Sequence, residues 1–407
     1  MKTLCLNNKF AKVIVPVVLI IILEGCKFSL SWKSRENITD TFVIIEKPKD
    51  TTAREKVTLK PKSPGSEFTR VTDTVEISIS SQKEQDTLHG YLLFCDDHGE
   101  ISTKLQSLKK DSVRMLKVTG VVNSDDLYYI GNNFSSLEFL DLEDCSIIGK
   151  SIPEGLFDSE KREVKLRRII FPSDLKSIER KAFALCRYLE GPLVFPKTLK
   201  SIGEHAFYSC RLLKGPLILP EDLETIGSWA FAKCTNITGP LTLPGKINEI
   251  GSQAFTYCYS LTGDLKIPSS VKIVRFAAFC ECRGFDGNLI LPAGLKEIEK
   301  HAFSYCKNLR GELKLPETLV NIGIFAFAGC SSFTGTLEIP HSIEKIGMKA
   351  FFMCDSLSCV SVKWSYPIAY TSNMFPGEIK ISVPAEYIKE YEKSLGWSNH
   401  NLVAEIK

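Results

Sequence analysis

The sequence predicts an α/β solenoid: a right-handed stack of coils with a parallel β spine, short helical or 3₁₀ turns on the opposite side, and a cap at each end. The first observation is a proline that recurs every 24 residues, at positions 172, 196, 220, 244, 268, 292, 316 and 340. The second is the pair Ala-Phe, which recurs eight times, from Ala182-Phe183 to Ala350-Phe351. A fixed period of this length indicates a repeat array rather than separate globular domains.

Each repeat contains the signals for one coil. Alternation in segments such as Leu217-Ile218-Leu219 predicts a short strand with its leucines pointing inward. The proline that follows ends the ladder pairing, because it has no N–H to donate. From Ala-Phe onward, apolar residues at helical spacing predict a single helical or 3₁₀ turn. One coil cannot bury its apolar side chains alone, so coils must stack into a continuous core.

The full pattern, L-x-G-x-L-x-L-P-x-x-L-x-x-I-G-x-x-A-F-x-x-C, resembles the BspA-like leucine-rich repeats of anaerobe surface proteins. The resemblance is strict over residues 172–356. Upstream, residues 137–147 match the general leucine-rich repeat, and downstream, residues 381–385, Tyr391 and residues 396–399 resemble the closing segment of bacterial members. The resemblance implies a leucine-rich-repeat solenoid with a surface or periplasmic binding role, for which adhesion is often proposed.

The N-terminus predicts export. Lys2, Lys9 and Lys12 precede an apolar run, Val13–Leu23, which is too short to span a bilayer but suits the core of a signal peptide. The run ends in Leu-Glu-Gly-Cys26, which resembles a bacterial lipobox and implies lipidation of Cys26, although Glu24 departs from the small or apolar residue usual there.

These signals divide the chain into five parts. They are a signal peptide (1–25), a flexible tether rich in Lys, Ser, Thr and Pro (26–74), an N-terminal cap with irregular leucine-rich repeats (75–150), the repeat array (151–356, with eight strict units from Pro172) and a C-terminal cap (357–407). A small folded module in place of the tether stays open, because residues 41–45 have the composition of a strand.

A cysteine follows each Ala-Phe by three residues, at positions 186, 210, 234, 258, 282, 306, 330 and 354. Because all eight hold the same structural position, we expect buried free thiols that pack as small hydrophobes. Cys280 stands two residues before Cys282, but no second Cys/His pair at ligand spacing accompanies it, so a surface thiol is expected. The states of Cys95, Cys145 and Cys359 stay open.

Several kinds of chemistry lack a signal. Lys and Arg (51) nearly balance Asp and Glu (48), which argues against nucleic-acid binding. There is no nucleophile elbow, phosphate loop, dinucleotide fingerprint or close His pair, so neither a cofactor, a metal nor an enzyme activity is predicted. His205 and His301 occupy equivalent variable positions before Ala-Phe and are expected to be solvated surface residues.

A binding surface is expected on the concave face, where the outward side chains of stacked strands lie side by side. The candidate partner-binding residues are Pro192, Val194, Pro216, Ile218, Pro240, Thr242, Asp264, Lys266, Asn288, Ile290, Glu312 and Lys314; Thr336 and Glu338 continue the series. The first coils are apolar there, which is typical of a contact site. The alternative is that these residues merely suit edge-like strands or lie beneath the N-terminal region.

Three functional classes follow. The first is an exported, lipid-anchored binding or adhesion protein of the cell envelope, expected at the outer membrane, as a monomer, with a host or bacterial protein or peptide as partner. Whether it faces the surface or the periplasm stays open. The second is a glycan-capture accessory lipoprotein, for which Trp364, Tyr366 and Tyr370 are the nearest aromatic platform. The third is an enzyme with an unrecognised site in residues 75–150.

Overall fold

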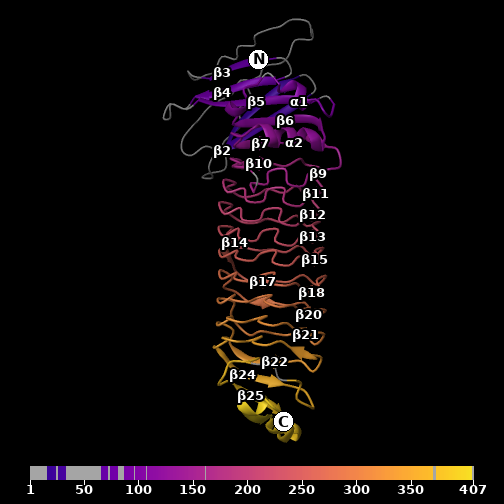
Figure 1. Ribbon diagram of the computed structural model, residues 1–407, viewed down its shortest axis with the longest axis vertical. Coiled ribbons are helices and arrows are strands. Elements are labelled where there is room, and N and C mark those ends of the chain that lie inside the picture. Colours follow the sequence, from indigo (N-terminus) through magenta and orange to yellow (C-terminus); the bar gives the residue numbers. More distant parts are fainter. Residues whose placement is uncertain are drawn as a thin grey trace, which may run out of the picture.

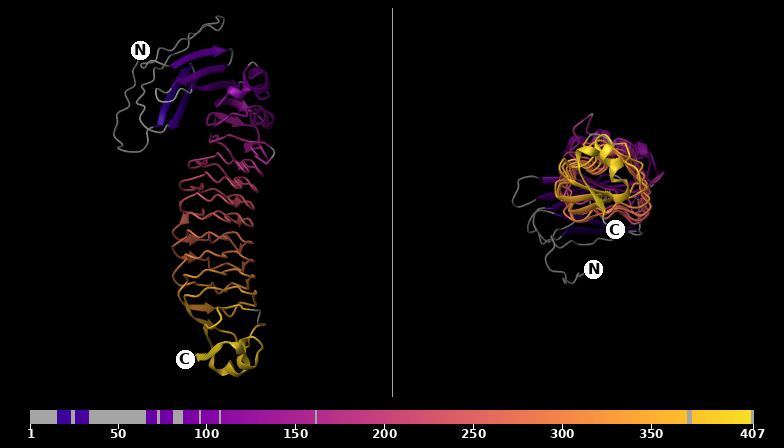
Figure 2. Two further views of the ribbon diagram at one scale, coloured as in Figure 1. Left: turned by 60° about the vertical axis from the view of Figure 1, so that its left-hand side comes forward. Right: turned by 90° about the horizontal axis from the view of Figure 1, so that it is seen from below.

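The computed structural model describes residues 16–23, 26–33, 66–71, 74–80, 87–95, 97–106, 108–160, 162–369 and 373–405, and every structural statement below refers to these. Parallel-strand coils stack along one axis as a leucine-rich-repeat solenoid of about 12 turns, with a sheet and helices at the N-terminal end and a small cap at the C-terminal end (Figure 1). Viewed along the axis, the coils superpose (Figure 2). Among the described residues, each helix is too short or too polar to cross a bilayer.

The N-terminal end combines antiparallel and parallel pairing. One seven-stranded sheet has the order β10-β7-β6-β5-β4-β3, with β8 paired to β6. The pairs β3·β4 and β4·β5 are antiparallel, whereas β5, β6, β7 and β10 run parallel and begin the solenoid. The elements of this end are β3 (Ser66–Val71), β4 (Thr74–Ser80), β5 (Thr87–Cys95), α1 (Ile101–Lys104), a 3₁₀ turn (Lys110–Ser112), β6 (Met115–Val122), α2 (Ser124–Asn133), β7 (Phe139–Asp141), β8 (Cys145–Ile147) and β10 (Arg168–Ile170).

Two further strands, β1 (Pro16–Leu23) and β2 (Cys26–Lys33), form an antiparallel pair. β1 falls within the range predicted as a signal peptide, and β2 and β3 fall within the range predicted as a tether. The division into export signal, tether and caps stays a prediction.

The array has two strand ladders, of which the sequence predicts one. The predicted ladder follows the Leu-x-Leu segments and consists of short strands or single bridges, because the proline after each segment cannot donate to it. The second follows a two-residue step, x-Ile or in one coil Ile273-Val274, five to six residues after each proline, and the second residue of the step is buried. The second ladder consists of β9 (Ser151–Ile152), β11 (Ser177–Ile178), β12 (Ser201–Ile202), β13 (Thr225–Ile226), β15 (Glu249–Ile250), β18 (Ile273–Val274), β20 (Glu297–Ile298), β21 (Asn321–Ile322) and β23 (Lys345–Ile346). The strands of the predicted ladder are β17 (Leu265–Lys266), β19 (Leu289–Ile290) and β22 (Gly335–Ile339), whereas β14 (Gly239–Pro240) and β16 (Leu261–Thr262) pair with each other just before the Leu-x-Leu segments of their coils.

The Ala-Phe segments form turns rather than helices. Single i→i−3 bonds close them, such as Ala206 N to Gly203 O (3.2 Å) and Tyr208 N to His205 O (3.1 Å), as the 3₁₀ expectation requires. The bonds do not propagate, because His205 (φ 56°) and Ser209 (φ 59°) adopt the left-handed conformation on either side of Ala-Phe. The freed amides bond to the next coil instead, as Phe207 N does to Ala230 O (2.8 Å).

The core is a column of phenylalanines longer than the eight strict repeats. Ten rings stack with centroids 5.1–5.8 Å apart, from Phe157 through the eight Ala-Phe units to Phe375. The two end members follow Leu156 and Met374 rather than alanine. The array therefore continues by one coil beyond the strict repeats at each end.

The repeat glycines serve close packing between coils. A Cβ on Gly203 would lie 2.7 Å from Arg180 N, and one on Gly227 would lie 2.5 Å from Glu204 N. Neither residue has positive φ. The requirement for glycine at these positions is thus the approach of the preceding backbone rather than turn geometry.

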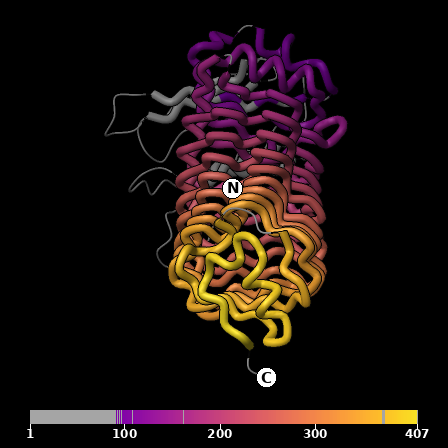
Figure 3. The backbone as a smooth tube through the Cα atoms, turned by 60° about the horizontal axis from the view of Figure 1, so that its bottom comes forward, coloured from indigo at the N-terminus to yellow at the C-terminus, as the bar shows by residue number. Residues whose placement is uncertain are grey.

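The segment predicted as the C-terminal cap lies across the last coil (Figure 3). The buried Trp397 contacts Phe375, Tyr391 and Trp364, with ring centroids 6.1, 5.1 and 6.0 Å away. The cap thereby continues the phenylalanine column with larger rings. Its elements are β24 (Leu357–Val362), β25 (Lys380–Pro384), a 3₁₀ turn (Ala385–Tyr387), α3 (Ile388–Lys393), a second 3₁₀ turn (Trp397–Asn399) and β26 (Asn401–Glu405), with β22-β24-β25-β26 in one parallel sheet.

Candidate binding surface

The outward side chains of the Leu-x-Leu segments form one surface, which we call the strand face. All twelve candidate partner-binding residues lie on it and are exposed. The leucines between them are buried, as Leu193 (7 % exposed) and Leu217 (4 %) show. The alternation of inward and outward side chains therefore holds in every coil for which the sequence predicts it.

The N-terminal half of the strand face is apolar. Val194 and Ile218 are 76 % and 68 % exposed, and a parallel bridge places them side by side. Pro192, Pro216 and Pro240 flank them and are exposed. These five side chains form an apolar strip on a backbone held by the coils above and below.

One coil upstream, β10 extends this strip. Arg168 and Ile170 stand 24 residues before Pro192 and Val194, and Glu190 N donates to Arg167 O (2.9 Å) to hold the two coils together. Arg168 is exposed and Ile170 half-buried. The sequence pattern does not predict either residue, because the strict repeat begins only at Pro172.

The C-terminal half of the strand face is polar, and part of its polarity is satisfied internally. The Asp264 carboxylate accepts hydrogen bonds from Asn288 N (2.7 Å) and Asn288 Nδ2 (3.3 Å). Asp286 accepts one from Gly263 N (2.8 Å). Ile290, 42 % exposed, is the one aliphatic residue predicted for this half. Groups already bonded to the ladder offer less to a partner than the free apolar strip does.

The repeat cysteines are free and buried, as expected. Each thiol donates to the carbonyl of a phenylalanine in an earlier coil, 29 residues before Cys186 and 27 residues before each of the other seven, at S···O distances of 3.0–3.2 Å. Burial raises the pKa of Cys186, Cys234 and Cys354 to about 12, so these thiols are poor nucleophiles at neutral pH. Cys95 and Cys145 are also free and buried, and Cys280 and Cys359 are free and half-buried.

His205 and His301 differ from the expectation of solvated residues. His205 stacks on Trp229 (5.8 Å) and His301 on Phe325 (5.0 Å), and both are half-buried. Burial lowers the pKa of each imidazole, which favours the neutral form. Neither belongs to a metal site: within the described part of the chain, no three His, Cys, Asp or Glu side chains are placed to hold an ion.

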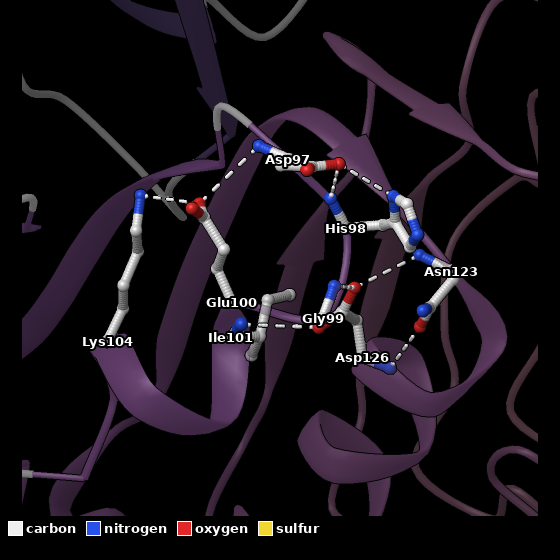
Figure 4. Close-up of polar contacts among 8 residues, drawn as sticks. All are labelled: Asp97, His98, Gly99, Glu100, Ile101, Lys104, Asn123 and Asp126. Carbon is white, nitrogen blue, oxygen red and sulfur yellow. Dashed lines mark hydrogen bonds and ion pairs between the residues drawn. The ribbon is translucent and has the colours of Figure 1, made fainter.

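The polar cluster in residues 97–126 is a structural clamp. The buried Asp126 carboxylate accepts bonds from Gly99 N (2.7 Å), Ile101 N (3.2 Å) and Asn123 N (3.1 Å), while Asn123 Oδ1 accepts one from Asp126 N (2.9 Å) (Figure 4). These bonds cap α2 with a capping box and tie it to the start of α1. Because Asp126 is engaged by backbone donors, the cluster does not resemble a general acid or base site.

A buried ion pair lies in the same region. Lys117 Nζ is 3.2 Å from Asp141 Oδ2 and 2.6 Å from Asp144 Oδ2, and the side chains of Lys117 and Asp141 are 1 % and 0 % exposed. The register of β6 with β7 places Lys117 opposite Asp141. A substrate would have no access to Lys117 or Asp141, so this pair cross-links two strands of the sheet.

Two adjoining hollows, of about 430 and 670 Å³, share Asn132 and Arg162 as lining residues. Arg162 donates to Asn132 Oδ1 and to Leu156 O (2.8 Å), which joins α2 to the first coil. At the rim, Arg180 pairs with Glu154 at 2.6 Å. The cationic groups of Arg162 and Arg180 are thus engaged within the protein.

The aromatic platform considered for a glycan is incomplete. Trp364 is 6 % exposed and donates from Nε1 to Ile343 O (3.0 Å), so it belongs to the cap core. Tyr366 is 71 % exposed beside Tyr387, at 5.9 Å. Tyr370 lies outside the described residues.

Comparisons with known proteins place this geometry in a family. The model described as "BspA type Leucine rich repeat region (6 copies)" matches residues 150–286 and 287–382. No curated protein matches the sequence.

Three solved structures are similar to parts of the chain. A leucine rich cell surface protein from Faecalibacterium prausnitzii is 15 % identical, covering 84 % of this chain and 93 % of its own, with a TM-score of 0.35. The T. pallidum Leucine Rich Repeat protein is 23 % identical, covering 59 % and 81 %, with a TM-score of 0.31. A leucine-rich repeat protein from Eubacterium ventriosum is 13 % identical, covering 84 % and 97 %, with a TM-score of 0.33. Because the family model matches more than half of the sequence, the chain belongs to the BspA-type leucine-rich-repeat family.

Proposed function

We propose that the chain is an exported binding protein of the cell envelope that recognises a protein or peptide partner through the strand face. The observation that carries this proposal is the apolar strip at Val194 and Ile218, where two of the most exposed large aliphatic side chains lie side by side on a rigid ladder. Exposed apolar side chains on a preorganised backbone lose little conformational freedom when a partner covers them.

The proposal includes a location. The apolar run Val13–Leu23 acts as an export signal, and Cys26 carries a lipid that anchors the chain to the outer membrane as a monomer. Protease added to intact cells tests the orientation. Loss of the repeat region means display at the surface and favours adhesion, whereas protection favours a periplasmic role.

The binding test starts with a partner captured from host or bacterial protein extracts, with a glycan array in parallel. The double substitution Val194→Lys/Ile218→Lys then places charges in the strip. We expect it to weaken the captured partner's binding by about tenfold or more, as loss of a central apolar contact does. The control is Thr336→Lys/Glu338→Lys in β22, where Glu338 has the register of Val194 and Ile218 and Thr336 that of Pro192 and Pro216. This variant should bind as the parent does. Equal binding by parent and strip variant contradicts the proposal, and glycan binding without protein binding moves the function to the glycan-capture class.

A further inference from the structure

The side of the solenoid formed by the Ala-Phe turns, which we call the turn face, changes polarity halfway along the array. Two residues before each Ala-Phe, one position recurs at the surface. From the N-terminus it holds Arg180, Glu204, Ser228, Ser252, Phe276, Lys300, Ile324 and Met348. The first four are polar, while Phe276, Ile324 and Met348 are 36 %, 36 % and 39 % exposed.

Neighbouring positions enlarge the apolar part. Tyr305 and Met353, at the same position two coils apart, are 45 % and 43 % exposed. Phe325 and Phe352 are half-buried between them, and the Lys349 ammonium lies 5.7 and 5.1 Å from their ring centroids. The result is an apolar patch across four consecutive coils, about 15 Å long at a coil spacing of about 4.8 Å.

The charges around the patch are unbalanced. Glu299 accepts from Arg275 (3.3 Å) and from Phe276 N (2.6 Å), and Glu281 pairs with Arg283. Lys300 is exposed and Lys349 half-buried, and neither forms an ion pair with the residues that the structure describes. Lys300 and Lys349 are therefore free positive charges at the patch, and Asp355, exposed two residues after Met353, is a carboxylate with no ion pair among the described residues.

The backbone beneath the patch is fixed and has its donors engaged. His301 N donates to Ile324 O (2.9 Å), Phe325 N to Met348 O (3.1 Å) and Phe303 N to Ala326 O (2.8 Å), each across to the next coil. An added strand would find these donors occupied. A row of exposed apolar side chains on a fixed backbone, with lysines among them, suits a planar anionic surface better than an extended peptide.

We propose that the turn face from Phe276 to Met353 binds the surface of an anionic lipid bilayer. The apolar side chains enter the boundary between headgroups and acyl chains, and Lys300 and Lys349 contact anionic headgroups. The contact uses the side of the solenoid away from the Leu-x-Leu segments and leaves the strand face free for a partner. It is independent of a lipid on Cys26.

The test uses the full chain with Cys26→Ser, which removes the acyl acceptor, and a pair of tryptophan reporters at one structural position. Ile324→Trp lies in the patch, and Ser252→Trp is the matched control three coils earlier. With vesicles of equal parts phosphatidylcholine and phosphatidylglycerol, the emission of Ile324→Trp should shift to shorter wavelength and be quenched by brominated lipid. Ser252→Trp should show neither change beyond the parent.

A second pair measures the affinity for vesicles. Ile324→Glu/Met348→Glu should weaken binding to phosphatidylglycerol-containing vesicles by about tenfold or more relative to Ser228→Glu/Ser252→Glu. Circular dichroism checks that both glutamate variants fold. If the patch variant does not fold, the two tryptophan reporters alone test the proposal. Equal responses from the two reporters overturn the proposal. A dimer in sedimentation that only the patch variant converts to a monomer also overturns it and assigns the patch to contact between copies.

Discussion

Each repeat cysteine has a bonding role that a small apolar residue would not fill. The thiol of Cys234 donates to Phe207 O (3.0 Å), while Cys210 N donates to the same carbonyl (3.2 Å). The phenylalanine carbonyl is thus satisfied from its own coil and from the next one. An alanine would fit the space but would leave the contact between coils unmade.

Thiol burial makes stability depend on pH. Burial raises the pKa of Cys234 to about 12, above the value of about 8.5 for an exposed thiol. The folded state therefore keeps the proton that the unfolded state loses, so this stabilisation is complete below about pH 8.5 and falls as pH rises toward 12. We expect the stability difference between the parent and Cys234→Ala to shrink by about 1.4 kcal/mol per pH unit above about pH 8.5.

Urea unfolding under reducing conditions at several pH values measures this difference. Lysine and tyrosine titration affects parent and variant alike and cancels in the comparison. A difference that is constant between neutral and alkaline pH would show that the thiol is not protected in the folded state.

At the same scale, the sequence predicts which side chains are buried but not the backbone conformation of the turns. The alternation around Leu193 and Leu217 is enough to predict that Val194 and Ile218 point outward, as they do. The left-handed positions, by contrast, hold residues as different as Trp229 (φ 59°) and Lys233 (φ 62°). Hydrogen bonds between coils impose these left-handed angles. The residue types at these positions therefore do not predict the angles from the sequence.

Among the elements, the sequence does not predict the second ladder, because this ladder also depends on contacts between coils. Its strands are two residues long, as in Ser201–Ile202 and Thr225–Ile226, and too short to show alternation. Their pairing is a consequence of stacking, because Ile202 lies beside Ile226 only once the coils are in register. A periodic isoleucine is visible in the sequence, but it predicts only a buried position.

At the N-terminal end, the stability of two elements depends on one carboxylate. Asp126→Ala would remove the acceptor of the Gly99, Ile101 and Asn123 amides. We expect a loss of about 2–3 kcal/mol in the free energy of unfolding of this region, because a helix cap and buried donors lose their partner. Amide hydrogen exchange over α1 and α2 measures it. Asp125→Ala, at the exposed neighbouring position, is the control and should change exchange little; equal effects of the two substitutions would contradict the clamp.

The whole molecule has opposite polarity on its two faces. The strand face is apolar in its first coils, at Val194 and Ile218, whereas the turn face is apolar in its last coils, at Ile324 and Met348. The repeat pattern leaves these positions free to vary, since neither contributes to the core. The proposed partner on the strand face and the proposed bilayer on the turn face would therefore contact separate surfaces of one rigid scaffold.

The stack extends further than the repeat motif predicts. Its end coils have the stacked phenylalanine of the repeats but do not match the full repeat motif. Phe157 and Phe375 continue the phenylalanine column after Leu156 and Met374, at the position where the strict repeats have alanine. The end coils face a cap rather than another repeat, so the space beside the ring differs. Terminal repeats of solenoids are atypical for this physical reason.

In a stack whose coils contact only their neighbours, removal of an end should act locally. Trp397 is fully buried and donates from Nε1 to Ile368 O (2.9 Å), while Tyr391 OH donates to Trp364 O (3.1 Å) to close the same cap. Trp397→Ala would leave a cavity against Phe375, at a local cost of about 3–5 kcal/mol. We expect faster hydrogen exchange in β24, β25 and β26 and in the last coil, with the ladder from β11 to β15 unchanged. The control, Leu395→Ala, removes a side chain that is 90 % exposed two residues away and should leave the exchange pattern intact. Uniformly faster exchange as far as β11 would mean that the coils unfold as one cooperative unit, because only a coupling that outweighs each coil's own stability can carry the loss of a cap through the whole stack.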